Sequence, residues 1–328
     1  MIHPVFSENF IPIVFSSDND YIKYLSVTVV SIVMNSAEKM NYDLIVLGHN
    51  IDTKKKEELE KTISEHQNFS LRFFDVAELL ENSGFHSLPV SGQLSISAYF
   101  RLFIPDLLKT YDRCVYLDAD LVVNFDLKFF QELDLDNFLL AAVRDLVICN
   151  NARVPHHPDR HYLLNILGFQ DIDGYFNSGM LIMNLKEMRA FKFLDKVKDK
   201  LKELPDPPRH DQSLLNSVCR GRVYYLDIKY NFLWEYDHSL ITDKPLIIHY
   251  VGYFKPWHFK NKNELANYFW KYADKSPFYK ELRREYLKFS RKNKKKYYRY
   301  KMLSILFLGA SKKYNKKRIS QKEMLDLL

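Results

Sequence analysis

Short apolar runs alternate with amphipathic stretches over the first part of the chain. Residues 11–15, 43–47 and 70–74 are apolar runs of strand length, which is the pattern of buried strands. Residues 21–35 and 53–66, which separate them, have the length and polarity of helices. Strands that alternate with helices in this way predict an α/β fold with a parallel sheet.

The alternation continues to about residue 257. After that residue the chain is predicted to be helical and then basic. We therefore expect an α/β domain over residues 1–265 and a basic helical region over residues 266–328. Further strands are predicted at residues 113–117, 139–143, 178–184, 223–226 and 245–249, and further helices at residues 95–107, 186–204 and 211–218.

The composition excludes several classes of protein. With 47% hydrophobic and 27% charged residues in 328, the chain is neither disordered, nor a collagen, nor a multispan membrane protein. It has nine glycines and neither of the glycine-rich phosphate-binding motifs, so any nucleotide must be held by other means. Three cysteines without a C-x-x-C spacing favour a reducing cytoplasm. We see no secretory signal and no apolar run of the roughly 20 residues that a spanning helix needs.

Positive charge is concentrated near the C-terminus. The net charge is +7, yet no acidic residue occurs between Glu285 and Glu323, and the remainder of the chain is acidic. In this basic tail, tyrosines precede the apolar run 302–308, a composition typical of a helix that lies in a membrane interface. We expect the tail to bind an anionic membrane surface. A helix packed on the protein body and a nucleic-acid-binding tail are the alternatives.

Acidic residues follow two of the predicted strands. Asp18 comes after the first, and Asp118 and Asp120 come after the strand at 113–117. Ligands of open α/β sheets bind beyond the carboxyl ends of strands, and residues two apart in an extended segment point to the same side. Two converging carboxylates repel each other unless a cation lies between them, so the pair predicts a Mg²⁺ or Mn²⁺ site. The alternative is a D-x-D turn that only caps a helix.

A histidine ends the last predicted strand. His249 could add an imidazole ligand, which Mn²⁺ tolerates better than Mg²⁺ does. Gly252 would let a backbone amide approach a phosphate, and Lys255 would supply a positive charge for it. The other histidine cluster, formed by His156, His157 and His161, is interpreted as part of a surface or acceptor-side loop.

Taken together, the motifs resemble family 8 of the glycosyltransferases, especially the bacterial lipopolysaccharide galactosyl- and glucosyltransferases. D-x-D alone is a weak signal, whereas the ordered set is highly specific. The matching segments are I-V-F-S-S-D-N-D-Y (13–21), Y-F-R-L (99–102), Y-L-D-A-D (116–120), F-N-S-G-M-L-I-M-N-L (176–185), H-D-Q (210–212) and H-Y-V-G-Y-F-K-P-W (249–257).

The resemblance implies a GT-A fold and retaining transfer of a hexose from a UDP-sugar, with Mn²⁺ bound and Mg²⁺ as the second choice. It also implies a role for each matching residue. The metal ligands would be Asp118, Asp120 and His249; the uracil and ribose contacts Ser16, Ser17, Asp18 and Tyr21; the donor-sugar contacts Arg101, Asp145 and Asn177; the diphosphate contacts Gly252 and Lys255; and the residues near the anomeric carbon Asp211 and Gln212. Asp20 departs from the family, in which asparagine is frequent.

The same resemblance bears on mechanism and acceptor. Gln212 is a poor nucleophile, so we expect front-face attack, with Asp145 and Asp211 as the carboxylates for a covalent route. The expected acceptor is a lipid-linked lipopolysaccharide core, which would place a cytoplasmic enzyme peripherally on the inner face of the membrane, with no nucleic acid as partner. The alternatives are a transferase that acts on a glycoprotein or another saccharide, and a non-catalytic nucleotide-sugar-binding protein.

Overall fold

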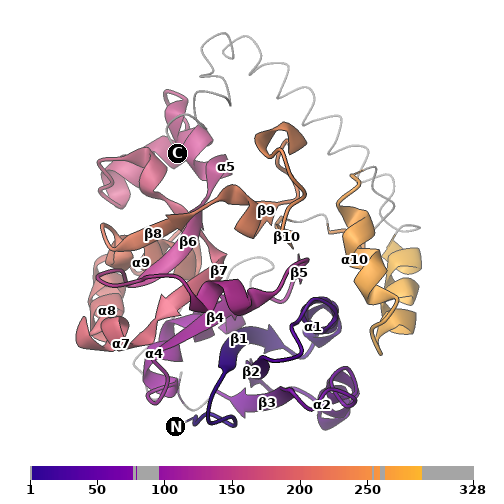
Figure 1. The fold of residues 1–328 in the computed structure, drawn as a ribbon. Coiled ribbons are helices and arrows are strands. Elements are labelled where there is room, and N and C mark those ends of the chain that lie inside the picture. Colours follow the sequence, from indigo (N-terminus) through magenta and orange to yellow (C-terminus); the bar gives the residue numbers. More distant parts are fainter. Residues whose placement is uncertain (1, 77–78, 80–95, 253–254, 259–262, 290–328) are drawn as a thin grey trace.

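The computed structural model describes residues 2–76, 79, 96–252, 255–258 and 263–289 of the chain (Figure 1). These residues form an α/β fold with a seven-stranded main sheet and a three-stranded second sheet. The basic tail, for which membrane binding is predicted, falls at residues 290–328 and lies outside the described residues.

The main sheet has the strand order β3-β2-β1-β4-β7-β6-β8. Neighbouring strands are parallel except at β7, which is antiparallel to both β4 and β6. The sheet is therefore mostly parallel, as predicted, but mixed. Its strands are β1 (Phe10–Asp18), β2 (Asn41–His49), β3 (Phe69–Asp75), β4 (Arg113–Leu117), β6 (Leu140–Arg144), β7 (Phe176–Asn184) and β8 (Val223–Leu226).

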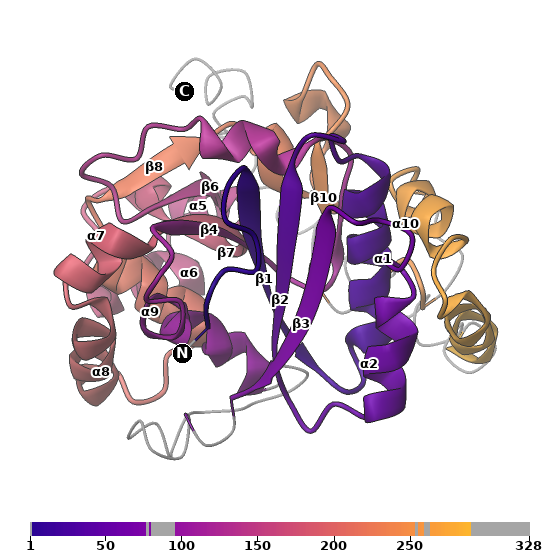
Figure 2. The ribbon, with the colours of Figure 1, turned by 60° about the horizontal axis from the view of Figure 1, so that its bottom comes forward.

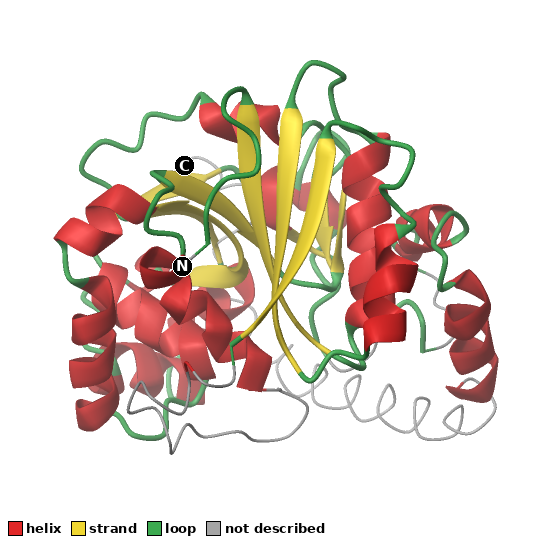
Figure 3. Cartoon of the chain, turned by 90° about the horizontal axis from the view of Figure 1, so that it is seen from below, coloured by secondary structure: helices red, strands yellow, loops and turns green. Residues whose placement is uncertain are grey.

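Helices cover both faces of the main sheet (Figures 2 and 3). Alternate side chains of β1 enter different cores: Ile13 and Phe15 pack with one set of helices and Val14 with the other. Burial on both faces explains why the strands read as continuous apolar runs. The first face packs against α1 (Ile22–Met34), α2 (Thr53–Glu60) and α10 (Ala266–Ala273), and the second against α4 (Ile104–Leu107), α7 (Leu185–Ala190), α8 (Phe193–Glu203) and α9 (His210–Cys219).

The second sheet has the order β5-β10-β9 and is built from very short strands. Its strands are β5 (Leu121–Val123), β9 (Phe232–Leu233) and β10 (Ile247–His249). Beside the main sheet, α5 (Leu146–Arg153) and the π-helix η3 (Tyr162–Ile166), which follows α6 (Pro158–His161), pack in a small third core. The chain thus passes from β4 in one sheet to β5 in the other through the three residues Asp118-Ala119-Asp120.

Two predicted helices differ from the structure. The helix expected at 186–204 breaks at Lys192, which has a φ of 56°. Met188 and Phe193 are both buried, and five residues apart on one continuous helix they would point about 140° apart. The break into α7 and α8 lets both side chains reach the core. The helix expected at 95–107 is described from Ile96 onward as the 3₁₀-helix η1 (Ile96–Phe103) followed by α4.

The helices after the second sheet pack on α1. Residues 279–289 are helical, and Lys23 of α1 forms an ion pair of 2.6 Å with Glu285 in that helix. The hydroxyls of Ser26 and Ser276 lie 2.6 Å apart, and Leu282 is completely buried in the same core as β1. Among the helices that the structure describes, we find none with both the length and the apolar character needed to cross a membrane.

Truncation of Leu282 should destabilise the whole protein. We expect Leu282→Ala to lower the free energy of unfolding by about 2–5 kcal/mol, because it leaves a cavity in the main core. Leu287 lies in the same helix but is 49% exposed, so Leu287→Ala should change the free energy by less than about 0.5 kcal/mol. Urea denaturation of both variants measures the difference, and equal losses would show that residues 279–289 do not pack as described.

Candidate functional site

Two aspartates lie where the chain crosses from one sheet to the other. The Asp118 amide donates to the carbonyl of Gly179 on β7 at 2.8 Å, and the Asp120 carbonyl accepts from the Tyr250 amide at 2.9 Å. In the antiparallel pairing of β5 with β10, His249 stands opposite Leu121. The backbone register of two sheets therefore brings His249 next to the two aspartates.

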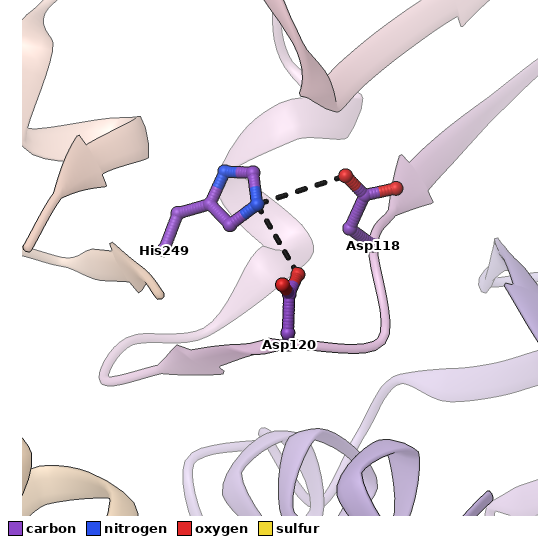
Figure 4. A group of neighbouring side chains, drawn as sticks. All are labelled: Asp118, Asp120 and His249. Carbon is purple, nitrogen blue, oxygen red and sulfur yellow. Dashed lines mark ion pairs between the residues drawn. The ribbon is translucent and has the colours of Figure 1, made fainter. Parts of the chain in front are cut away.

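The three side chains form a compact group of acceptors (Figure 4). Nε2 of His249 lies 3.2 Å from an Asp120 oxygen and 3.6 Å from an Asp118 oxygen. One ligand atom from each residue lies within 4.8 Å of the other two. The predicted convergence of the three side chains is confirmed, but for a different reason: Ala119-Asp120 is a turn, so the two aspartates do not lie on one extended segment.

The backbone beneath this group has no room for a side chain. A Cβ added at Gly179 would lie 2.1 Å from Cε1 of His249 and 2.7 Å from Oδ2 of Asp118. Two carboxylates and one imidazole, held close above a glycine, match the oxygen and nitrogen donors that Mn²⁺ accepts. The residues present therefore fit a divalent cation.

Two fixed cations lie beside the aspartates. The Arg101 guanidinium contacts Asp118 at 2.9 Å and Asp211 at 3.0 Å, and the Lys255 ammonium contacts Asp120 at 2.6 Å. Burial alone would raise the pKa of Asp120, but Lys255 and His249 overcome it and hold that pKa well below its usual range. Asp120 is therefore a carboxylate at neutral pH, the form that binds metal.

A cavity of about 370 Å³ opens over the aspartates. This volume is within the range of small-molecule binding sites. Ala98 and Arg101 both line it because residues three apart in the 3₁₀-helix η1 lie on one side. The cavity brings together the predicted residues Ser16, Asp18, Tyr21, Arg101, Asp118, Asp120, Gly252 and Lys255, and adds Ser97, Ala98, Tyr116 and Ala119, which were not predicted.

The loop after β1 is shaped by Asp18. One oxygen of its carboxylate accepts the backbone amides of Asp20 and Tyr21, at 3.0 and 2.9 Å. Burial, and then the negative charge of Asp120, raises the pKa of Tyr21, which keeps its hydroxyl protonated. Ser17 was predicted with these residues, but it is buried and is not among the residues that line the cavity.

A network of buried and half-buried polar side chains lies next to Arg101, which lines the cavity. One oxygen of Asp145 accepts from the amide groups of Asn177 at 3.4 Å and Gln212 at 3.3 Å. The Gln212 carbonyl in turn accepts the Ser178 amide at 3.0 Å. Burial raises the pKa of Asp211 to about 6, with Arg101 opposing that shift. The four predicted residues Asp145, Asn177, Asp211 and Gln212 thus lie together, adjacent to the cavity rather than on its described lining.

Gly179 and Asn231, which contact the metal centre, were also not predicted from the sequence, whereas the histidine cluster lies at the surface as one of its two interpretations expected. An isolated glycine in a strand signals close approach of another group, and this could have identified Gly179. Asn231, which contacts His249, carries no such signal. His156 and His161 are exposed, and His157 accepts the amide of the residue two positions on, at the start of α6.

Comparisons with known proteins agree with this geometry. The family model for "Glycosyl transferase family 8" matches residues 12–261. General stress protein A of Bacillus subtilis is 27% identical over 79% of this chain and 92% of its own, and the lipopolysaccharide 1,2-glucosyltransferase of Escherichia coli K12 is 26% identical over 75% and 72%. The crystal structure of the galactosyltransferase LgtC with donor and acceptor sugar analogues superposes with a TM-score of 0.68, at 25% identity, over 80% of this chain and 95% of that one. The chain belongs to glycosyl transferase family 8.

Proposed function

We propose that the protein transfers a hexose, galactose or glucose, from a UDP-hexose to a glycan acceptor with retention of configuration. One observation carries the proposal: Asp118 and Asp120 converge with His249, from a distant part of this family 8 chain, beside a cavity of about 370 Å³. The solved relative LgtC, named as a galactosyltransferase with donor and acceptor analogues bound, supports the same class of reaction.

Asp118, Asp120 and His249 would hold Mn²⁺, with Mg²⁺ as the second choice. Bound there, the cation would supply Lewis-acid stabilisation of the UDP leaving group. Lys255 lies at the wall of the cavity and places a positive charge where the diphosphate charge grows. Gly252, with a φ of 85°, lines the same cavity and has no side chain between its backbone and a phosphate oxygen.

The polar network beside the cavity would hold the sugar. We assign Arg101, Asp145 and Asn177 to the donor hexose, and Ser16, Ser17, Asp18 and Tyr21 to the uridine. Asp18 and Tyr21 line the described cavity, which supports their part of the assignment.

The contacts around Gln212 and Asp211 favour front-face attack. Gln212 is a neutral amide, and both of its polar ends are engaged in hydrogen bonds. The Asp211 carboxylate is paired with Arg101, and one oxygen of Asp145 accepts two amides. These contacts lower the nucleophilicity of each group. The leaving phosphate oxygen would then take the proton of the acceptor hydroxyl.

The proposed acceptor is the core of a lipopolysaccharide or lipooligosaccharide. Support comes from a relative at 26% identity that is named as a lipopolysaccharide glucosyltransferase. With such an acceptor, residues 1–265 would form the catalytic domain. In the basic region 266–328, α10 and residues 279–289 pack on the core of that domain, and the tail beyond them would hold the protein on the cytoplasmic face of the inner membrane.

A screen of UDP-sugars tests the proposal. Purified protein is incubated with UDP-glucose or UDP-galactose, with and without MnCl₂ and a lipooligosaccharide acceptor. We expect UDP release that requires one UDP-hexose and Mn²⁺, rises with acceptor, and stops with EDTA. Binding of the UDP-hexose without any release would contradict transfer and favour a non-catalytic binding protein. Full activity in EDTA would contradict the proposed requirement for a divalent cation.

A further inference from the structure

His249 makes a second contact on the side away from the aspartates. Its Nδ1 lies 3.1 Å from the side-chain oxygen of Asn231, which ends the 3₁₀-helix η5 (Ile228–Asn231). Both residues are buried: His249 is 3% and Asn231 1% exposed. Water therefore cannot replace Asn231 as the partner of Nδ1 without a change in packing.

The backbone fixes Asn231 against β10 from both sides. The Leu246 amide donates to the Lys229 carbonyl at 2.9 Å, and the Trp234 amide donates to the His249 carbonyl at 3.0 Å. Asn231 lies between these two anchors in the sequence. Its side chain is consequently held in one place relative to the imidazole.

The orientation of the Asn231 amide follows from its neighbours. The Gly179 backbone N–H can only donate, so the Asn177 atom that it contacts at 3.0 Å is the oxygen Oδ1. Asn231 approaches the same oxygen at 2.9 Å, so it does so with its donor Nδ2. The acceptor end of Asn231 is then the end that faces His249.

This orientation fixes the role of each ring nitrogen of His249. An acceptor opposite Nδ1 requires a proton on Nδ1, so Nε2, which faces Asp118 and Asp120, is the nitrogen that can exchange a proton for a cation. A metal-bound imidazole commonly donates its other N–H to a fixed acceptor, which orients the ring and strengthens the ligand.

We infer that Asn231 is a positioning residue of the metal centre: its side-chain carbonyl holds the Nδ1 proton of His249 and so directs Nε2 at the cation site. The inference rests on the proposed function. Asn231 is not among the residues that line the described cavity, and it acts on the cation site through His249. The same pair of amides also links the metal centre to Asp145, because Asn177 donates to it.

Binding of Mn²⁺ without turnover tests the inference. MnCl₂ is titrated calorimetrically into the full-length protein at a constant concentration of UDP. Asn231→Leu keeps the size of the side chain but removes the acceptor, and we expect Mn²⁺ to bind about 10- to 100-fold more weakly. The matched control is Asn216→Leu. Asn216 is also fully buried but bonds the backbone of Phe176 and Gln212 rather than a metal ligand, so this change should leave Mn²⁺ affinity within about threefold of wild type.

A conservative variant separates positioning from general stability. Asn231→Asp retains an oxygen for Nδ1 but loses the donor to Asn177, so it should unfold at a lower urea concentration yet bind Mn²⁺ within about threefold of wild type. Loss of Mn²⁺ affinity in parallel with stability would overturn the inference, as would wild-type affinity in a folded Asn231→Leu protein. If Asn231→Leu does not fold, the aspartate variant decides alone. If the wild-type protein binds no Mn²⁺, the proposed function itself fails.

Discussion

Asp118→Asn is expected to reduce sugar transfer by at least about 10³-fold. The change removes one negative charge from the cation site but keeps an oxygen that can accept the Tyr116 hydroxyl, which now lies 2.8 Å from Asp118. Loss of the cation would remove several kcal/mol of leaving-group stabilisation, and about 4 kcal/mol corresponds to a 10³-fold lower rate. Initial rates of UDP release quantify the loss. They are measured at saturating UDP-hexose, with the Mn²⁺ concentration raised to about tenfold above the wild-type requirement.

The control is another aspartate-to-asparagine change, made at a residue far from the cation site in the sequence. Asp199 is exposed on α8 and pairs with Lys202, so Asp199→Asn should retain the wild-type rate. Near-normal transfer by Asp118→Asn, with its Mn²⁺ dependence intact, would remove this carboxylate from the metal site.

The second large effect is expected from one added methyl group. In Gly179→Ala, the new Cβ would lie 2.1 Å from a buried ring carbon of His249, so the imidazole or β7 must shift. Because Asp118 would also be displaced, we expect Mn²⁺ binding and sugar transfer to fall below detection. The added volume should cost about 1–3 kcal/mol of stability, so the variant should still fold. Mn²⁺ titration and thermal unfolding measure the two effects separately.

A glycine outside the metal centre provides the comparison. An added Cβ at Gly174 meets its nearest atoms at 3.6 Å, which is ordinary contact, so Gly174→Ala should bind Mn²⁺ as the wild type does. A Gly179→Ala protein with wild-type Mn²⁺ affinity would mean that the cation does not lie over β7.

The sequence predicted the main sheet better than the second sheet. Strands such as β1 and β4 are buried on both faces, so their residues form an apolar run that is long enough to be recognised in the sequence. The strand β5 has three residues and β9 has two, too few for any periodicity to appear. The D-x-D segment could be found by its spacing, but its role as the crossing between two sheets depends on β5 and was therefore missed.

Contacts that depend on tertiary structure explain what was missed in the site. The aspartates and His249 were identified from their positions at strand ends and from the family motifs. Asn231 lies near His249 only because β9 and β10 pair in parallel, and Gly179 lies beneath the cluster only because β7 pairs with β4. Pairings between distant segments leave little trace in a single sequence.

The location of bound manganese shows whether Asp118, Asp120 and His249 hold the cation. Crystals grown with MnCl₂ and UDP would be measured for the anomalous scattering of the metal. We expect one strong anomalous peak within coordination distance of Asp118, Asp120 and His249, with UDP in the adjoining cavity. A peak bound elsewhere, or UDP bound in that cavity with no metal beside these three side chains, would contradict it.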